Sequence, residues 1–240
     1  MKKTKNITES QNINSIDIDT KNISEIIKIF NHDNKDIIDG INNSSDDIEN
    51  IVRLTLESLL DGGRLFYVGA GTSGRLGVLD AAECKPTFGV DSSMVQGVIA
   101  GGEKALSESI EGAEDKIDDI KGIIANKKIS SNDIIIGISC SGRALFVLEF
   151  LKLSKKIGAK TALITFNDVD DIKYIDKMLK VFVGPEIISG STRMKSGTTT
   201  KMILNMISTI TMIKLNKTYG NYMVDLKVVN NKLLLRAVNI

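Results

Sequence analysis

Short apolar runs alternate with helical stretches through the middle of this chain, and that alternation is its most constraining feature. Runs of this kind, each ending at glycine or a polar residue, are typical of strands that are covered on both faces of a parallel sheet. The runs are Leu65–Val68, Val95–Ala100, Ile134–Ile138, Ala162–Phe166 and Val181–Val183. Helical patterns lie between them, as at Ala105–Ile124 and Leu145–Ile157. The order predicts an α/β fold with a doubly wound parallel sheet of about five strands.

The first third of the chain has helical periodicity. Apolar residues recur at the spacing of one helix face. They are Ile23, Ile26, Ile27 and Phe30, followed by Ile37, Ile38 and Ile41. A longer amphipathic pattern begins at Asp46 and ends at Gly62–Gly63. We therefore expect an N-terminal helical segment over residues 1–60, packed on an α/β domain over residues 61–240.

Composition excludes several kinds of chemistry. The chain has 240 residues, and its 31 basic and 30 acidic side chains give a net charge of +1. That balance offers no electrostatic reason to expect a nucleic acid or an anionic membrane as partner. The single histidine, His32, excludes sites that need two. Cys84 and Cys140 lie far apart and predict free thiols in a reducing cytoplasm. Carboxylates, hydroxyls and backbone groups remain as the available chemistry.

The longest uncharged apolar run, Met202–Ile213, is too short to cross a bilayer and contains Asn, Ser and Thr. It predicts a buried core or interface helix. The polar residues that follow the basic N-terminus do not form a secretory signal. We therefore expect a cytoplasmic protein without a membrane partner.

A glycine-rich loop follows the first predicted strand. Gly69–Gly74 reads GAGTSG, which satisfies the GxGxxG pattern of dinucleotide sites. That fingerprint also needs an acidic residue about 20 positions further on, for the ribose. The nearest candidate, Glu103, lies further away than that and follows Gly101–Gly102. The dinucleotide alternative is therefore weak.

A second loop, Ser139–Arg143 (SCSGR), follows another predicted strand and precedes another helix. Two hydroxyl-rich strand ends suit one phosphate, which would bind backbone N–H groups at helix N-termini and Ser and Thr side chains. The absence of a GKS/T lysine argues against an NTPase. The alternative is that glycine and serine only permit tight turns and cap helices. The candidate phosphate-binding residues are Gly71, Thr72, Ser73, Ser139, Ser141 and Gly142.

A third polar cluster, Ser189–Thr198, precedes the Met-rich helix. Its hydroxyls and two cations suit an anionic, hydroxylated ligand, and a capped helix start with solvated basic residues is the alternative. The candidate binding residues are Ser191, Thr192, Arg193 and Lys195.

Several longer segments resemble the N-acetylmuramic acid 6-phosphate etherases, a family of sugar isomerase (SIS) domain proteins. The matching segments are Gly69–Cys84 (GAGTSGRLGVLDAAEC), Gly101–Glu103, Glu111–Asp115, Val183–Lys195 (VGPEIISGSTRMK), Tyr219–Asn221 and Met223–Asp225, with a weak match at Thr8–Glu9. The resemblance runs over essentially the whole chain. It implies a three-layer α/β/α SIS-type fold and a phosphosugar-binding domain over residues 61–240.

The resemblance implies a lyase that cleaves the lactyl ether of N-acetylmuramic acid 6-phosphate. The products are N-acetylglucosamine 6-phosphate and D-lactate, formed in cell-wall amino sugar recycling by elimination and hydration, without a metal or redox cofactor. The family's two catalytic carboxylates fall on Glu83 and Glu114. We expect Glu83 to act as the acid for the leaving lactate and Glu114 as the base at carbon 2, because an ether needs a proton donor and carbon 2 a base. Without the resemblance, Glu114 would be read as a solvated residue of an acidic run.

One straight helix from Ser73 to Glu83 would rise about 15 Å, which is longer than a hexose phosphate. Either the helix ends near Asp80, or the Glu83 that serves one phosphate comes from a second subunit. We therefore expect a homodimer with shared sites.

The chain departs from the family pattern in three places. Ala144 and Leu145 stand where Thr and Pro are usual, and Gln11 stands where Arg is common. The missing threonine hydroxyl costs the phosphate site on the order of 1 kcal/mol. The chain stops at Asn239–Ile240 in the middle of an apolar helical pattern, and we therefore expect the family's C-terminal helical segment to be missing.

Two other functions remain open from the sequence. One is a SIS-type regulatory protein that binds a phosphosugar without catalysis, as glucokinase regulatory proteins do. The other is a phosphosugar isomerase, which would share the phosphate loops. Release of lactate separates the etherase from both.

Overall fold

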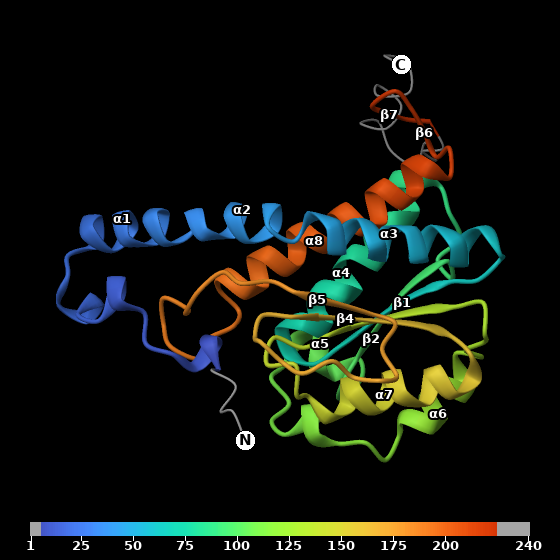
Figure 1. Ribbon diagram of the computed structural model, residues 1–240, viewed down its shortest axis with the longest axis horizontal. Helices are drawn as coiled ribbons and strands as arrows, with labels where there is room; N and C mark the ends of the chain where they lie inside the picture. The colour runs from blue at the N-terminus through green and yellow to red at the C-terminus, as the bar shows by residue number, and fades with distance from the viewer. Residues whose placement is uncertain (1–5, 225–240) are drawn as a thin grey trace.

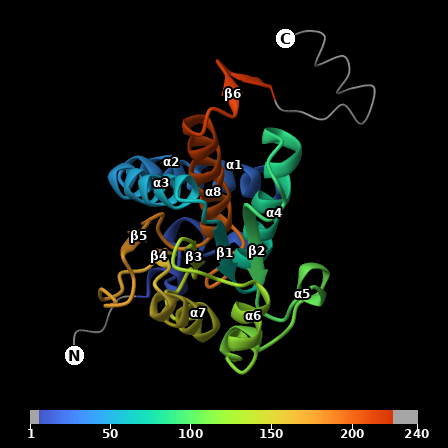
Figure 2. The same ribbon diagram turned by 90° about the vertical axis from the view of Figure 1, so that its right-hand side faces the viewer.

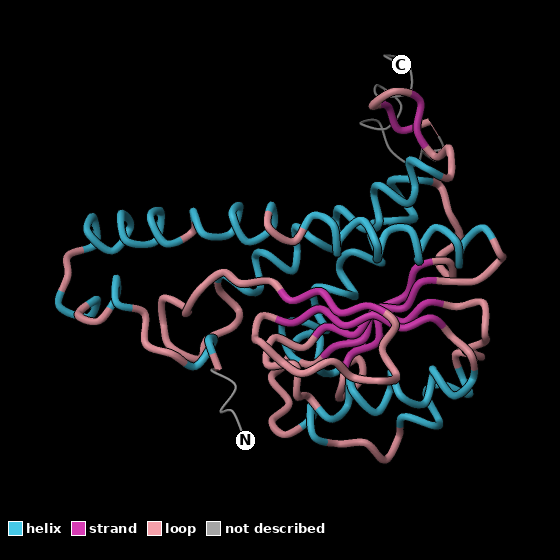
Figure 3. The backbone as a smooth tube through the Cα atoms, in the orientation of Figure 1, coloured by secondary structure: helices cyan, strands magenta, loops and turns pink. Residues whose placement is uncertain are grey.

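The computed structural model describes residues 6–224, and its centre is a parallel sheet of five strands in the order β2-β1-β3-β4-β5 (Figure 3). The strands are β1 (Leu65–Gly69), β2 (Val95–Ile99), β3 (Ile134–Ile138), β4 (Lys160–Thr165) and β5 (Lys177–Lys180). Every neighbouring pair in this sheet is parallel. Strands β1, β3 and most of β4 are fully buried, as expected for strands covered on both faces.

Helices cover both faces of the sheet, which confirms the three-layer α/β/α fold (Figures 1 and 2). One face is covered by α3 (Ser45–Leu60), α4 (Gly71–Phe88) and α8 (Lys195–Lys214). The other face is covered by α6 (Ile120–Asn126) and α7 (Leu145–Ile157). The predicted helix Leu145–Ile157 is confirmed at both ends, and the apolar run Met202–Ile213 lies inside α8.

The N-terminal third forms helices α1 (Ile23–Asp33), α2 (Lys35–Asn42) and α3, as the periodicity predicts. The 3₁₀ turns η1 (Ile7–Glu9), η2 (Ile13–Ser15) and η3 (Ile18–Thr20) precede them. Helix α1 begins at a capping box, in which Asn22 and Glu25 satisfy each other's backbone N–H groups. Helix α3 packs on α8 and on the sheet, and a short hairpin of β6 (Thr218–Tyr219) and β7 (Tyr222–Met223) follows α8.

Two predicted elements are wrong. The fifth strand is Lys177–Lys180 and not Val181–Val183. It is an edge strand, and its lysines are tolerated because, among the described residues, one of its edges pairs with no other strand. The predicted helix Ala105–Ile124 is broken into α5 (Lys104–Ser107), the 3₁₀ turn η4 (Ala113–Asp115) and α6. The break lies between Glu108, which is extended, and Gly112, whose φ of 68° favours glycine.

The strands end level with one another at a single edge of the sheet. Gly69 of β1 pairs with Ile99 of β2 and with Ile138 of β3, and Ile138 pairs with Ile164 of β4. The loops that follow these strands therefore begin side by side, which is where ligands bind in open parallel sheets.

Buried charges tie the N-terminal helices to the start of α8. The Lys195 ammonium, 2% exposed, lies 3.1 Å from the equally buried Asp33 carboxylate and 3.2 Å from Asp36. Asp33 also accepts from the Asn12 amide at 2.7 Å. The fully buried Glu186 accepts from the backbone N–H groups of Lys195 (2.8 Å) and Ser196 (3.0 Å) and so caps α8.

Within residues 6–224, no helix is long and apolar enough to cross a membrane. Both cysteines, Cys84 and Cys140, are free as predicted. Asp225 and the Asn239–Ile240 end, which the resemblance to the family drew on, lie outside the described residues.

We predict that Lys195→Met lowers the free energy of unfolding by about 3–5 kcal/mol, because it leaves the buried Asp33 carboxylate without its counter-ion. Arg53 forms an exposed pair with Glu49 on α3, so the control Arg53→Met should cost less than about 1 kcal/mol. Urea unfolding of both variants measures the difference. Equal, small losses would contradict this role for Lys195.

Candidate active site

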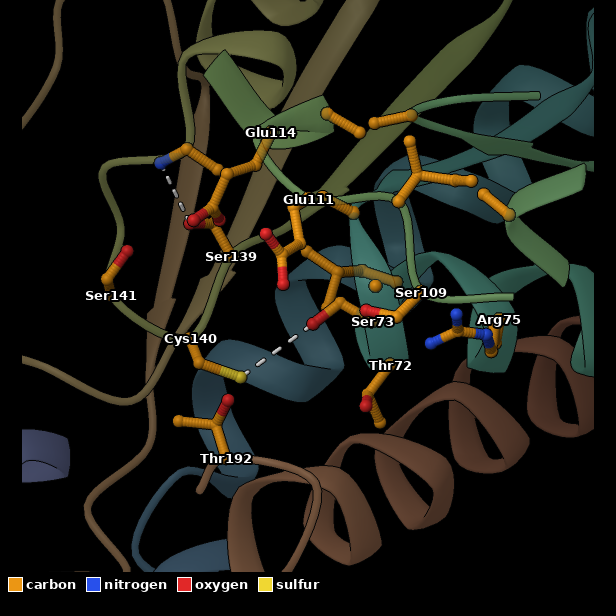
Figure 4. Close-up of a pocket in the computed structure, with 18 of the residues that line it drawn as sticks. Thr72, Ser73, Arg75, Ser109, Glu111, Glu114, Ser139, Cys140, Ser141 and Thr192 are labelled. Atoms are coloured by element: carbon orange, nitrogen blue, oxygen red, sulfur yellow. Dashed lines mark hydrogen bonds between the residues drawn. The ribbon is translucent and has the colours of Figure 1, made fainter. Parts of the chain in front are cut away.

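A cavity of about 390 Å³ lies where β1 and β3 end, and its size is in the range of small-molecule sites (Figure 4). Besides Ala100 and Ala105, most of the residues of five segments that are far apart in sequence line it. They are residues 8–9, residues 70–75 with the start of α4, residues 109–114, residues 138–144 before α7, and the pair Gly190 and Thr192. The cavity therefore brings together the predicted residues Gly71, Thr72, Ser73, Ser139, Ser141, Thr192 and Glu114.

The hydroxyls of the second loop can donate into this cavity. The Ser139 Oγ accepts from the Ala144 backbone N–H at 3.3 Å, and the Ser141 Oγ accepts from the Arg143 N–H at 3.2 Å. These bonds use acceptor lone pairs and leave each hydroxyl proton available to a ligand. Gly142 does not line the cavity. It makes the turn at φ 69°, where a Cβ would lie 2.8 Å from Val169 Cγ1.

Two helices, α4 and α7, begin at the cavity. Neither N-terminus is capped by a side chain, so backbone N–H groups of their first turns are available to a ligand. The partial positive charge of two helix ends, together with Thr72, Ser73, Ser139 and Ser141, makes this end of the cavity suited to an anion.

Cys140 lies at the floor of the cavity, with its sulfur 3.7 Å from the Ser73 hydroxyl (Figure 4). Burial raises the pKa of the Cys140 thiol to about 11, so the thiol is neutral at pH 7. Cys140 is therefore a poor nucleophile, and its carbonyl has a structural role in accepting from Asn167 and Thr165.

Three carboxylates line the cavity. Glu114, which the sequence predicts, is in η4, and Figure 4 shows its side chain beside Ser139. Glu111 lies nearer to Ser73, just before the turn at Gly112. Glu9 comes from the N-terminal arm. Glu111 and Glu114 therefore both line the cavity from the segment in which the predicted helix Ala105–Ile124 is broken.

The N-terminal arm is fixed against the cavity wall by Thr8. Its N–H donates to Asn167 Oδ1 at 3.2 Å, the Asn167 amide donates to its hydroxyl at 2.9 Å, and its carbonyl accepts from Gly190 N–H at 3.1 Å. Glu9 follows directly and lies against Gly190. The weak family match at Thr8–Glu9 was the one sequence signal for Glu9, since the residues that hold the arm there are more than 150 positions away.

Glu83 is not in this cavity. It lies in a separate groove of about 220 Å³ between α4 and α8, with Lys201 and Asn205. Buried Asp80 also lines this groove and accepts a hydrogen bond from the Asn205 amide at 2.7 Å. Burial raises the pKa of the Asp80 carboxyl. Helix α4 continues through Glu83 to Phe88, so the expectation that it ends near Asp80 is wrong. Glu83 is ten residues beyond Ser73, about 15 Å along the helix.

Only part of the third polar cluster, Ser189–Thr198, lines the cavity. Thr192 lines the cavity, whereas Ser191, Arg193 and Lys195 are outside the set that lines it. Arg193 is exposed, and the Lys195 amine is held by Asp33 and Asp36. Arg75, which the sequence did not single out, is at the cavity instead. The sequence signal that could have identified Arg75 was its position inside Gly69–Cys84, the segment that resembles the family.

The sequence and the fold have clear relatives. Residues 47–155 match the family described as "Glucokinase regulatory protein N-terminal SIS domain". An N-acetylmuramic acid 6-phosphate etherase of Clostridium botulinum (strain Eklund 17B / Type B) is 48% identical over 234 residues, which is 97% of this chain and 78% of that protein. An N-acetylmuramic acid 6-phosphate etherase 2 of Enterococcus faecalis (strain ATCC 700802 / V583) is 45% identical, over 97% of this chain and 79% of that protein.

The fold is also that of solved phosphosugar proteins. A phosphoheptose isomerase of Neisseria gonorrhoeae superposes with a TM-score of 0.53 at 16% identity, over 78% of this chain and 97% of that one. At that identity the likeness shows the fold alone. The family follows from the two sequence relatives, each of which is covered over more than three quarters of its length. The chain therefore belongs to the N-acetylmuramic acid 6-phosphate etherase family.

Proposed function

We propose that this protein cleaves the lactyl ether of N-acetylmuramic acid 6-phosphate and releases N-acetylglucosamine 6-phosphate and D-lactate. The observation that carries the proposal is one cavity in which two hydroxyl-rich helix N-termini face Glu114. The relatives named for this reaction, 43–48% identical over nearly the whole chain, supply its identity. The reaction belongs to amino sugar catabolism, and we place it in the cytoplasm.

The phosphate binds at the end of the cavity formed by the two loops. Backbone N–H groups of α4 and α7 and the hydroxyls of Ser73, Ser139 and Ser141 supply its donors. Gly71, Thr72 and Thr192 complete this wall.

The chemistry is an elimination followed by hydration. Once the sugar ring opens to the aldehyde, Glu114 removes the proton on carbon 2, and the electron pair left behind forms the C2–C3 double bond as the C3–O bond breaks. The departing lactate oxygen takes a proton from an acid. Water then adds, with hydroxide to carbon 3 and a proton to carbon 2, so one water is consumed for each ether cleaved.

The acid in this scheme is Glu83, supplied by a second copy of the chain. Within one chain, α4 separates Glu83 from the Ser73 end of the same helix by about 15 Å. The side of α4 that carries Glu83 also exposes Leu79, whose side chain is 48% exposed. An apolar, partly charged groove at that position suits a homodimer in which each site combines Glu114 of one copy with Glu83 of the other.

A regulatory protein that only binds the phosphosugar is the alternative that the match to a glucokinase regulatory domain raises. That match covers residues 47–155, which include the phosphate loops that all such proteins need, and it does not distinguish binding from catalysis. The presence of Glu114 at the cavity favours the enzyme.

We predict that the protein releases D-lactate from N-acetylmuramic acid 6-phosphate and that Glu114→Gln lowers kcat by about 10²–10⁴-fold, because the base at carbon 2 is lost. A coupled D-lactate dehydrogenase assay measures the rate. Glu49→Gln, an exposed change on α3, is the matched control and should retain full activity. Absence of lactate with the unaltered protein would refute the function, and an active Glu114→Gln would refute the residue's role.

We predict that inactive Glu83→Gln and inactive Glu114→Gln proteins recover activity when they are mixed. In a mixed dimer one site receives both native glutamates and the other receives neither, so equilibrated mixtures should reach about a quarter of wild-type activity. Activity that stays at the sum of the two separate variants would show that each site is built from a single chain.

We predict that Ala144→Thr tightens binding of N-acetylglucosamine 6-phosphate about fivefold, since Ala144 lines the cavity and a hydroxyl there adds a donor worth about 1 kcal/mol. Ala144→Val has the same shape without the hydroxyl and is the control. Isothermal titration of both variants measures the effect. Equal affinities for the Thr and Val variants would contradict a phosphate contact at this position.

A further inference from the structure

The proposed substrate carries two anions, and the hydroxyl-rich loops account for one of them. The phosphate is on carbon 6, and the lactyl carboxylate is attached through the ether on carbon 3. A site that distinguishes this substrate from its own product needs a group for the second anion, because N-acetylglucosamine 6-phosphate lacks only the lactyl group. The inference below rests on the proposed function.

Arg75 is the one cationic side chain among the described residues that line the cavity. It lies in the first turns of α4, two residues after Ser73. The other charged residues at the cavity are the carboxylates Glu9, Glu111 and Glu114. A ligand with a second negative charge beyond the phosphate site is therefore attracted by the positive charge of Arg75.

The guanidinium of Arg75 is held in place by backbone carbonyls. Its Nε donates to the Leu106 carbonyl at 3.2 Å, and its Nη2 donates to the Glu108 carbonyl at 2.7 Å. These two carbonyls fix the orientation of the guanidinium without neutralising its charge. Within residues 6–224, Arg75 forms no ion pair and its Nη1 donates to no protein group. Two N–H donors on Nη1, and one more on Nη2, remain for a ligand.

Figure 4 places Arg75 and the phosphate loop at different ends of the cavity. Ser139 and Ser141 lie at one end, and Arg75 lies beside Ser109 at the other. Glu111 and Ser73 lie between them. A hexose placed with its 6-phosphate on the serine loop therefore directs the substituents of its far side, including that on carbon 3, towards Arg75.

We propose that Arg75 binds the carboxylate of the lactyl group and so sets the preference of this site for the ether over a sugar phosphate that lacks it. A planar guanidinium matches the two oxygens of a carboxylate, and a charge-assisted pair is stronger than a neutral hydrogen bond. The contact holds the leaving group while the C3–O bond breaks. The product sugar, which has no carboxylate, loses this contact and is bound only through its phosphate end.

Two other roles for Arg75 lead to different measurements. If Arg75 binds the phosphate, its loss weakens substrate and product alike. If Arg75 only holds residues 106–108 in place, its loss also disturbs the neighbouring wall and weakens both ligands. If Arg75 instead contacts the lactyl carboxylate, replacing Arg75 weakens the binding of ligands that carry this carboxylate and leaves the binding of the others nearly unchanged.

The test measures affinities by isothermal titration in the Glu114→Gln background, which keeps the ligand intact. Three ligands are compared: N-acetylmuramic acid 6-phosphate, the same compound with its lactyl carboxylate converted to the amide, and N-acetylglucosamine 6-phosphate. With Arg75 present, the acid should bind about 10- to 100-fold more tightly than the amide. With Arg75→Met, acid and amide should bind equally, and the affinity for N-acetylglucosamine 6-phosphate should change by less than about threefold.

Arg53→Met, an exposed arginine change on α3, is the control and should leave all three affinities unchanged. Equal binding of acid and amide with Arg75 present would overturn the proposal, and so would an equal loss of all three ligands in Arg75→Met. D-lactate release by the protein with its native Glu114 separates these outcomes from failure of the proposed function, since release with either result leaves the function standing.

Discussion

Direct contact between helix α4 and strands β1 and β2 is the constraint on which the rest of the site depends. A Cβ on Gly97 of β2 would lie 2.5 Å from the Val78 Cα, and one on Gly74 of α4 would lie 2.6 Å from Ile99 Cγ1. No side chain fits between helix and sheet at these points. The first turn of α4 is therefore held directly over the end of β1, and Thr72, Ser73 and Arg75 take their positions at the cavity from that contact.

The opposite wall of the cavity depends on charges buried away from it. Glu186 caps α8, and Lys195 in the first turn of that helix pairs with Asp33 of α1. A buried ion pair adds little net stability compared with an apolar pair, but it admits few alternative arrangements. Here it joins α1 to the start of α8, and Asn12 of the N-terminal arm donates to the same Asp33 carboxylate, next to the chain that supplies Thr8, Glu9, Gly190 and Thr192 to the cavity.

The sequence predicted what periodicity and local chemistry determine, and missed what depends on packing. Buried central strands and the loops of Ser73 and Ser139 follow from short apolar runs that end in small hydroxyl residues. Strand β5 was misplaced because an edge strand tolerates lysine and lacks the continuous apolar run. The break at residues 108–112 has only Gly112 as a local signal. Lys195 looked like a ligand for an anion because its partner Asp33 is 162 positions away in the sequence and no local pattern links them.

One continuous helix, α4, contributes Thr72 and Ser73 to the cavity and also keeps Glu83 away from it. Because α4 runs unbroken from Gly71 to Phe88, no small movement of a loop can bring Glu83 to the Ser73 end. In a single chain, Glu111 and Glu114 are also exposed to solvent, so water reaches both carboxylates. In the homodimer proposed above, a second copy seated over the cavity would bring its Glu83 to this site and cover these carboxylates. Two carboxylates with little water around them are the condition under which one glutamate can hold a proton while the other remains ionised.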